Sequence, residues 1–340
     1  MRWLIALITG CWLVACGEQQ PPVLSAADWQ AYKTAFVRAE GRVADTGNRG
    51  ISHSEGQGYG MLLALAAGDR PTFDSLWNWT RKTLQRDDKL FAWRWDESTA
   101  PHITDWNNAT DGDLLIAWAL ALAGERWNER GLREEARVIA ARLRESVIHH
   151  AGVGPLLLPA QHGFKHQDSL TLNPSYWVFP AFTVLDRVDP DPLWKGLTQS
   201  GLRLLDMARF GAHGTPPDWV IFHPDGRLEL PADVEKRRFG FEVVRVPLYL
   251  CLAGLQTPEL TQAFKSAWPS DEAPGWTDLV NGEQAAYALP LGQRAIRGML
   301  DACTPSAPPP PKLDIDSKDY YGSTLMLLTR IALTRSKALL

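Results

Sequence analysis

The chain has 340 residues, 45% of them hydrophobic, and a formal net charge of −4. This length allows one large domain or two ordinary ones, and the hydrophobic content is ample for a sizeable core. The charge gives no reason to expect nucleic acid or an anionic surface as a partner. The sequence has 15 tryptophans, and rows of tryptophan often form stacking platforms for flat apolar faces such as sugar rings. Trp77 and Trp118 lie within apolar helical patterns and are expected in the core instead.

The first residues have the pattern of an export signal. A single positive charge precedes a mostly apolar run, Trp3 to Ala15, which is too short to span a bilayer and fits a secretory signal. The run ends in Leu13-Val14-Ala15-Cys16, which resembles the bacterial lipobox, whose cysteine is lipidated and becomes the first residue. We expect residues 1–15 to be a lipoprotein-type signal peptide, 16–24 a tether and 25–340 a single domain. The protein is then periplasmic or anchored at the outer membrane through Cys16, and the alternative is a plain signal peptide with secretion.

Two of the four cysteines lie in or next to this signal, which leaves Cys251 and Cys303. These two could pair in an oxidising compartment, or Cys251 could be a buried thiol, because it lies in an apolar helical run. The spacing of cysteine and histidine does not suggest a metal site, so we expect no bound metal. His149 and His150 follow an expected helix end, where a cation is favoured.

Helical patterns recur from Ala26 onwards, with apolar residues three and four apart. They predict helices at residues 26–41, 58–84, 111–127, 131–148, 174–188, 191–211, 241–255, 257–270, 282–302 and 320–338. Clusters of Gly, Pro and Asp separate them. Strand-like alternation is scarce, and 218–230 is the best candidate for a hairpin. The sequence therefore predicts one all-α domain of about a dozen helices, at the spacing of an α-helical solenoid or toroid.

A polar, glycine-rich loop turns into an apolar helix between Ser52 and Ala67. Glu55 lies where the loop meets the helix, and a carboxyl there is a candidate acid with a raised pKa, because burial disfavours its charged form. Gly56, Gly58 and Gly60 would let the backbone turn sharply and a bulky substrate approach closely. The alternative is an ordinary helix start, with an acid that favours the helix dipole. The motif alone supports both interpretations equally.

Four further junctions place polar or aromatic residues at helix starts: 91–95, 107–113, 173–177 and 238–247. Trp93 and Trp95 are two residues apart and would face the same way in an extended segment. Asp111 is also a good first-turn residue with no further role. An ion pair between residues three apart is the simplest explanation for Glu242 and Arg245.

In a ring of helices, such helix starts can line a single groove. Two carboxyl groups that face each other across a tryptophan-lined groove would suit glycoside hydrolysis. One of them must be protonated to donate to the leaving oxygen, and the other must be ionised. The sequence spacing alone does not specify whether two such groups meet.

The segment Ser54-Glu55-Gly56-Gln57-Gly58-Tyr59-Gly60-Met61 resembles the signature of glycoside hydrolase family 8. Further matching motifs follow in the family's order: Thr110-Asp111-Gly112-Asp113, Asn173-Pro174-Ser175-Tyr176, Pro217-Asp218-Trp219, Arg245-Val246-Pro247 and Asp319-Tyr320-Tyr321. The resemblance runs from about Trp29 to the last helix. Within the family, the chain is similar to the periplasmic endo-β-1,4-glucanases, or cellulases, that accompany bacterial cellulose synthesis.

This resemblance implies that residues 25–340 form an (α/α)6 barrel, a catalytic domain of six inner and six outer helices with a groove built by loops. It implies an inverting endo-β-1,4-glucanase that needs no cofactor. Glu55 matches the general acid, Asp111 the aspartate that holds the distorted sugar, and Arg245 an arginine near the base. The expected sugar-contacting residues are Tyr176, Tyr320, Trp93, Trp95 and Trp106. The expected partners are a β-1,4-glucan and the cellulose synthase machinery, with membrane contact only through the lipid anchor.

One position departs from the cellulase subgroup. The base there is an aspartate three residues before the arginine, preceded by a tyrosine, whereas this chain has Phe241-Glu242. The longer side chain moves the carboxylate by roughly 1 Å, and a shift of that order can cost about a hundredfold in rate. Inversion leaves room for a water between carboxyls about 6.5–9.5 Å apart, which could absorb the longer arm. We predict Glu242 as the base, with Asp111 as the fallback.

Three alternatives stay open at this stage. The chain could act on xylan, mixed-linkage β-glucan or chitosan, or it could be a lipid-anchored glucan-binding protein that does not cut. An all-α scaffold of the solenoid kind would leave the tryptophan-rich loops unexplained.

Overall fold

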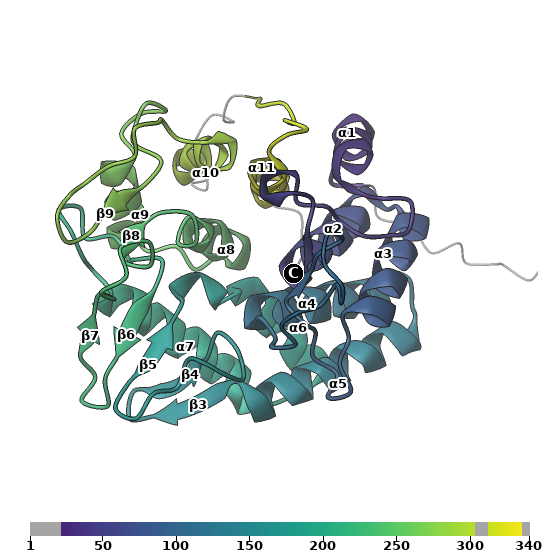
Figure 1. The fold of residues 1–340 in the computed structure, drawn as a ribbon, viewed down its shortest axis with the longest axis horizontal. Helices are drawn as coiled ribbons and strands as arrows, with labels where there is room; N and C mark the ends of the chain where they lie inside the picture. The colour runs from purple at the N-terminus through teal and green to yellow at the C-terminus, as the bar shows by residue number, and fades with distance from the viewer. Residues whose placement is uncertain (1–21, 303–311, 335–340) are drawn as a thin grey trace, which may run out of the picture.

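The computed structural model describes residues 22–302 and 312–334. These residues contain eleven α-helices and two short 3₁₀-helices (Figure 1). The α-helices are α1 (Ala26–Phe36), α2 (Ser54–Ala67), α3 (Arg70–Thr83), α4 (Thr110–Arg126), α5 (Arg130–Ser146), α6 (Phe179–Val188), α7 (Pro192–Met207), α8 (Arg245–Ala253), α9 (Pro258–Ala267), α10 (Leu291–Ala302) and α11 (Tyr320–Leu333). The 3₁₀-helices are η1 (Thr46–Asn48) and η2 (Pro174–Tyr176).

Nine short strands lie in the connections: β1 (Ser52–His53), β2 (Arg94–Trp95), β3 (Ile148–Ala151), β4 (Gly154–Leu157), β5 (Leu170–Leu172), β6 (Val220–Phe222), β7 (Leu228–Glu229), β8 (Arg238–Phe239) and β9 (Thr277–Asp278). They form the pairs β1–β2, β3–β4 and β8–β9 and the three-stranded sheet β5–β6–β7, all antiparallel. The strands thus connect and brace the helices rather than form a central sheet.

The helices form two layers. α2, α4, α6, α8 and α11 are buried on nearly every side, and each contacts the next until α11 meets α2 again, which closes a ring. The six other helices cover this ring and bury one face each. This architecture is the (α/α)6 barrel that the sequence predicts, represented by eleven α-helices in the described part of the chain.

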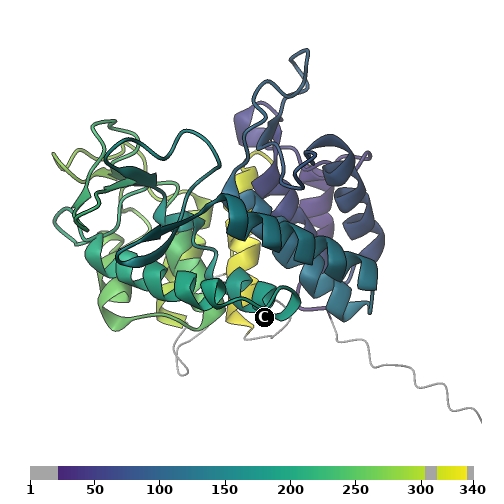
Figure 2. The same ribbon diagram turned by 90° about the horizontal axis from the view of Figure 1, so that it is seen from below.

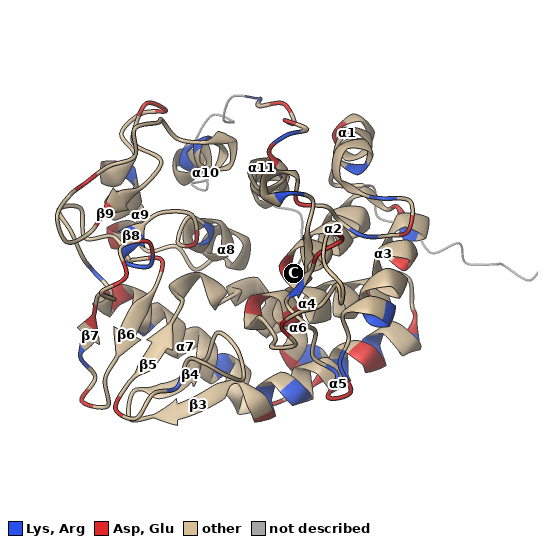
Figure 3. Cartoon of the chain, in the orientation of Figure 1, with Lys and Arg blue, Asp and Glu red and all other residues tan. Residues whose placement is uncertain are grey.

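The two layers follow from two kinds of sequence pattern. α4 is apolar around its whole circumference and buries Leu114 to Gly124 without interruption, as expected of a helix enclosed by other helices. α5 is amphipathic: it buries Ala136, Ile139, Ala140 and Leu143 and carries acidic and basic residues side by side on its outer face (Figure 3). Trp77 and Trp118 are buried, which confirms their expected place in the core.

Several expected helices differ in extent from those in the structure. The range 26–41 is helical only to Phe36, the range 174–188 is divided into η2 and α6, and the range 241–255 is helical only from Arg245. The range 58–84 is divided into α2 and α3, because Gly68 adopts a left-handed conformation (φ +71°) and the Asp69 side chain accepts from the Thr72 amide to cap the next helix. The range 282–302 is helical only from Leu291, and a loop with strand-like bridges precedes it.

The expected hairpin within 218–230 is confirmed by the pairing of β6 with β7. The β3–β4 hairpin was not expected; His149 and His150 follow the end of α5 at Ser146, as expected, and lie in β3. Leu172 of β5 lies opposite Val220 of β6. This register brings Asn173, directly after β5, and Asp218, two residues before β6, to the same end of the sheet.

The helices lie roughly side by side, and the loop that contains β2 projects beyond one end of them (Figure 2). Cys251 in α8 is disulfide-bonded rather than a free thiol. Cys303, the expected signal peptide 1–15 and Cys16 lie outside the described residues. Among the described helices, none combines the length and the apolar character needed to cross a membrane.

Candidate active site

Glu55 lies in the first turn of α2, so this helix begins before the apolar run that starts at Tyr59. His53 caps the helix, because its Nδ1 accepts from the Gly56 amide at 2.9 Å. The Ser54 amide donates to the carbonyl of Trp93 at 3.0 Å, as part of the pairing of β1 with β2. The start of α2, and with it Glu55, is therefore held by both the cap and this strand pair.

The glycines of this motif have a different role from the expected one. Gly56, Gly58 and Gly60 lie inside α2 and do not turn the chain. A Cβ on Gly58 would lie 2.5 Å from Leu115 Cβ on α4, and a Cβ on Gly112 of α4 would lie 2.7 Å from the Glu55 amide nitrogen. The glycines thus permit close packing of α2 on α4, which brings Glu55 near Asp111.

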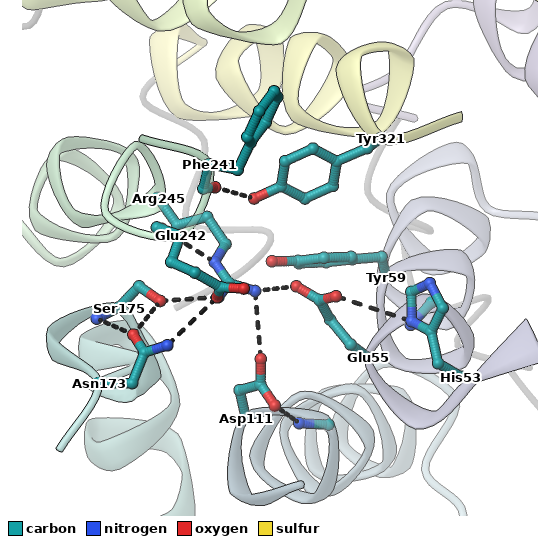
Figure 4. Close-up of polar contacts among 12 residues, drawn as sticks. His53, Glu55, Tyr59, Asp111, Asn173, Ser175, Phe241, Glu242, Arg245 and Tyr321 are labelled. Atoms are coloured by element: carbon teal, nitrogen blue, oxygen red, sulfur yellow. Dashed lines mark hydrogen bonds and ion pairs between the residues drawn. The ribbon is translucent and has the colours of Figure 1, made fainter. Parts of the chain in front are cut away.

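Arg245, at the start of α8, is the centre of the site (Figure 4). Its Nη1 contacts Glu55 and donates to Asp111 Oδ2 at 3.1 Å. Its Nη2 contacts Glu242 and donates to Ser175 Oγ at 2.7 Å. The ion pair expected between Glu242 and Arg245 exists, but the same guanidinium also contacts carboxylates from α2 and α4.

Glu242 lies in the turn that leads into α8 and is the most exposed of the three carboxylates. Its side chain is 35% exposed, against 17% for Glu55 and 3% for Asp111. Asn173 Nδ2 donates to Glu242 Oε2 at 3.2 Å, and Asn173 Oδ1 accepts from Ser175 Oγ at 2.6 Å. Asn173, Ser175 and Arg245 thus hold the Glu242 carboxylate from two sides.

The electrostatics of the cluster are dominated by burial and by like charges. Burial, followed by the charge of Glu55, raises the pKa of Asp111 to about 8, although Arg245 acts in the opposite direction. Asp111 therefore binds a proton near neutral pH. Burial alone would lower the pKa of His53, but its contact with Asp45 and the nearby charge of Glu55 raise the pKa of this histidine above its ordinary value.

The structure brings two of the five expected sugar-contacting residues to this cluster. The Arg245 guanidinium lies 5.6 Å from the ring centroid of Tyr176, whose ring also contacts Trp219. Trp93 is joined to the start of α2 through its carbonyl, and its Nε1 donates to Asp105 at 2.9 Å.

The other three make different contacts. Trp95 is half-buried, and its ring packs against Arg42, Trp79 and His102. Trp106 is 56% exposed and borders a separate surface hollow with Arg86 and His162. Tyr320 is only 1% exposed and packs against His53 and Phe36 behind the site. The expected sugar contact of Tyr320 stays a prediction, and in this structure its side chain is buried beside His53.

Several residues of the site had no assigned role in the sequence. They are His53, Asn173, Ser175, Asp218 and Tyr321. Tyr321 donates to the carbonyl of Phe241 at 2.9 Å, so it is the member of the tyrosine pair that reaches the turn with Glu242. All five lie within or next to the motifs that resemble the family, and this position is the signal that could have identified them.

A barrel of paired helices, with acidic side chains from distant parts of the chain gathered at its helix starts, defines a glycoside hydrolase site. The chain belongs to the glycosyl hydrolases family 8, whose family model matches residues 5–335.

Named relatives agree with this assignment. A probable endoglucanase of Novacetimonas hansenii is 40% identical over 318 residues, which cover 92% of this chain and 91% of the relative. An endoglucanase of Cellulomonas uda is 36% identical over 305 residues, which cover 88% of this chain and 83% of the relative. The solved structure of endo-β-1,4-glucanase CMCax from Acetobacter xylinum matches with a TM-score of 0.84 at 39% identity, over 92% of this chain and 98% of that chain.

Proposed function

We propose that this protein is an inverting endo-β-1,4-glucanase that hydrolyses cellulose or soluble β-glucan. The observation that carries the proposal is the meeting of Glu55 and Glu242 at the two terminal nitrogens of Arg245, although 187 positions separate them in the sequence. The names of the relatives support the same activity, since two are endoglucanases and the solved structure is an endo-β-1,4-glucanase.

In the proposed reaction, Glu55 is the general acid and Glu242 the general base. Protonated Glu55 donates its proton to the glycosidic oxygen as the bond from the anomeric carbon to that oxygen breaks. A water molecule bonds to the anomeric carbon from the opposite face and gives a proton to ionised Glu242. The greater exposure of Glu242 suits this role, because the base must be reached by water.

Asp111 suits the role of a sugar-holding residue better than that of a base. Burial and the charge of Glu55 raise its pKa to about 8, and its side chain is only 3% exposed, so it is poorly placed to take a proton from water. A sugar contact that strengthens as the ring distorts lowers the barrier.

The test is the viscosity of carboxymethyl cellulose during incubation with the purified protein. Wild type should lower the viscosity, and Glu55→Gln and Glu242→Ala should each lose about 10²–10⁴-fold in rate, as is typical when an acid or base is removed. Proton NMR of the first products should show the inverted anomer. Near-normal turnover by Glu55→Gln would remove the acid assignment, and near-normal turnover by Glu242→Ala would move the base elsewhere.

The same assay separates the alternatives. Release of reducing ends from xylan, mixed-linkage β-glucan and chitosan, measured beside cellulose, identifies the preferred polymer. A glucan-binding protein that does not cut would leave the viscosity unchanged while retaining affinity for the polymer.

We further propose that the protein is exported as a lipoprotein and works beside the cellulose synthase machinery. The support is the signal-like run and the lipobox-like Leu13-Val14-Ala15-Cys16 in the sequence. Mass spectrometry of the membrane fraction should find an acylated N-terminal Cys16, and an unmodified secreted form would contradict the anchor.

A further inference from the structure

Asp218 is a buried carboxylate beside the turn that carries Glu242. It is 5% exposed and lies two residues before β6. Its amide donates to the Arg238 carbonyl at 2.7 Å, and the Trp219 amide donates to the Lys236 carbonyl at 2.9 Å. These bonds align the start of β6 with the segment that leads through β8 towards Glu242.

One oxygen of Asp218 accepts hydrogen bonds from three backbone N–H groups of that turn. Oδ1 accepts from the amides of Gly240 at 3.3 Å, Glu242 at 3.0 Å and Val243 at 2.8 Å. The following residue, Val244, is the N-cap of α8 and supplies no side-chain cap of its own. The Asp218 carboxyl group therefore holds the turn that precedes the N-cap of α8, from outside the helix.

The approach of the turn to Asp218 is close enough to require glycine. A Cβ on Gly240 would lie 2.6 Å from Asp218 Oδ2. Burial, followed by the charge of Glu242, raises the pKa of Asp218 to about 8, and the three N–H groups oppose this rise. Asp218 is thus costly to bury, and its hydrogen bonds are made to the backbone of the turn rather than to a substrate-facing group.

We propose that Asp218 is the positioning residue of the general base: its carboxyl group fixes the backbone of residues 240–243 and so sets where the Glu242 carboxylate stands. This inference rests on the proposed function of Glu242. Asp218 acts on Glu242 through the backbone, because its Oδ1 binds three peptide groups of the turn. Asn173 and Arg245 then orient the carboxylate of Glu242, whereas Asp218 fixes the backbone to which this side chain is attached.

The test compares Asp218→Ala with Asp218→Asn on soluble β-glucan. The alanine variant loses the acceptor and should lower kcat about a hundredfold with KM nearly unchanged, because a displacement of about 1 Å is enough for such a loss. The asparagine variant keeps an acceptor oxygen and should retain kcat to within about fivefold. If the alanine variant does not fold, Asp218→Glu replaces it, since the longer arm should displace the turn and lower kcat in the same way.

Amide hydrogen exchange supplies a readout that does not depend on activity. In Asp218→Ala, the amides of Gly240, Glu242 and Val243 should exchange faster, and in Asp218→Asn they should stay protected. The control is Asp189→Ala, which removes another buried carboxylate, held by Arg144 at the far end of α6. This control should lower Tm and leave kcat and the exchange of these three amides unchanged.

The outcomes separate this inference from the proposed function. A wild-type kcat in Asp218→Ala, an equal loss in both variants, or unchanged exchange at the three amides would overturn the positioning role. An inactive wild type would instead remove the proposed function, and the exchange experiment would still show whether Asp218 holds the turn.

Discussion

Arg245 contacts three carboxylates that come from separate parts of the chain: Glu55, Asp111 and Glu242. One cation cannot neutralise three anions, so burial and mutual repulsion favour a proton on the least exposed of them, Asp111. Glu242 is the most exposed of the three carboxylates and the predicted base.

At this residue we predict that the surroundings are built for glutamate. Glu242→Asp should lower kcat about 10–100-fold with little change in KM, because the carboxylate withdraws by about 1 Å from Asn173 and Arg245. The measurement is the steady-state rate on soluble β-glucan. Glu242→Gln is the control, since it keeps the shape, loses the base and should be slower still. A Glu242→Asp variant faster than wild type would contradict the prediction.

At the scale of elements, the packing of α2 on α4 sets the distance between Glu55 and Asp111. Gly58 and Gly112 face the other helix, and each would place a Cβ in contact with it. A Cβ at Gly112 would meet Ser54 Oγ and the Glu55 amide, both in the first turn of α2. Gly112 therefore helps to set the position of Glu55, the expected acid, without contacting a substrate.

We predict that Gly112→Ala lowers the free energy of unfolding by about 1–3 kcal/mol, the usual cost of overpacking, and also slows hydrolysis by moving Glu55. Gly131→Ala is the matched control, because Gly131 is an exposed helical glycine in α5 with nothing within 4 Å of its Cβ position. That variant should raise stability by about 0.5–1 kcal/mol. Urea unfolding measures both, and a Gly112→Ala variant as stable as Gly131→Ala would refute the packing argument.

For the whole molecule, the decisive feature is the contact of the first and last helices, α1 and α11, beside the closure of the ring between α11 and α2. Tyr32 of α1 and Thr324 of α11 are fully buried, and their hydroxyl groups lie 3.0 Å apart. Thr324 Oγ1 also donates to the Tyr320 carbonyl at 2.8 Å, so Tyr32 is the donor of the pair. A bond between residues 292 positions apart forms only when the whole ring has closed.

We predict that Tyr32→Phe costs about 1 kcal/mol of stability, and that Thr324→Val costs about 1–3 kcal/mol because it leaves the tyrosine hydroxyl buried without this acceptor. The double variant should cost less than the sum of the two. Thr329→Val is the control, since Thr329 Oγ1 donates to Leu325 within α11, and its effect should add to that of Tyr32→Phe. Chemical denaturation measures the free energy of unfolding of each variant. If the Tyr32 and Thr324 changes were strictly additive, the hydrogen bond between α1 and α11 would contribute no coupling energy.

Most of the helices could be predicted from the sequence because their evidence is local. The spacing of apolar residues and the Gly, Pro and Asp clusters between helices are properties of neighbouring residues. The all-α class, the core tryptophans and the β6–β7 hairpin could therefore be predicted. The break between α2 and α3 was missed, since the left-handed turn at Gly68 and the Asp69 cap are single-residue events inside a continuous apolar pattern. The β3–β4 hairpin was missed for a similar reason, as four-residue strands carry little periodicity.

The sequence by itself determined which chemical groups are available and that each one stands at a helix start. Only the tertiary structure decided which of them meet. Arg245 contacts Glu55, Asp111 and Glu242. Tyr320 is buried, and the half-buried ring of Trp95 packs against Arg42. The physical reason is that ring closure and the glycine contacts between α2 and α4 join residues that are far apart in the chain. Burial and neighbouring charge, which set the protonation of Asp111 and Asp218, exist only after that closure.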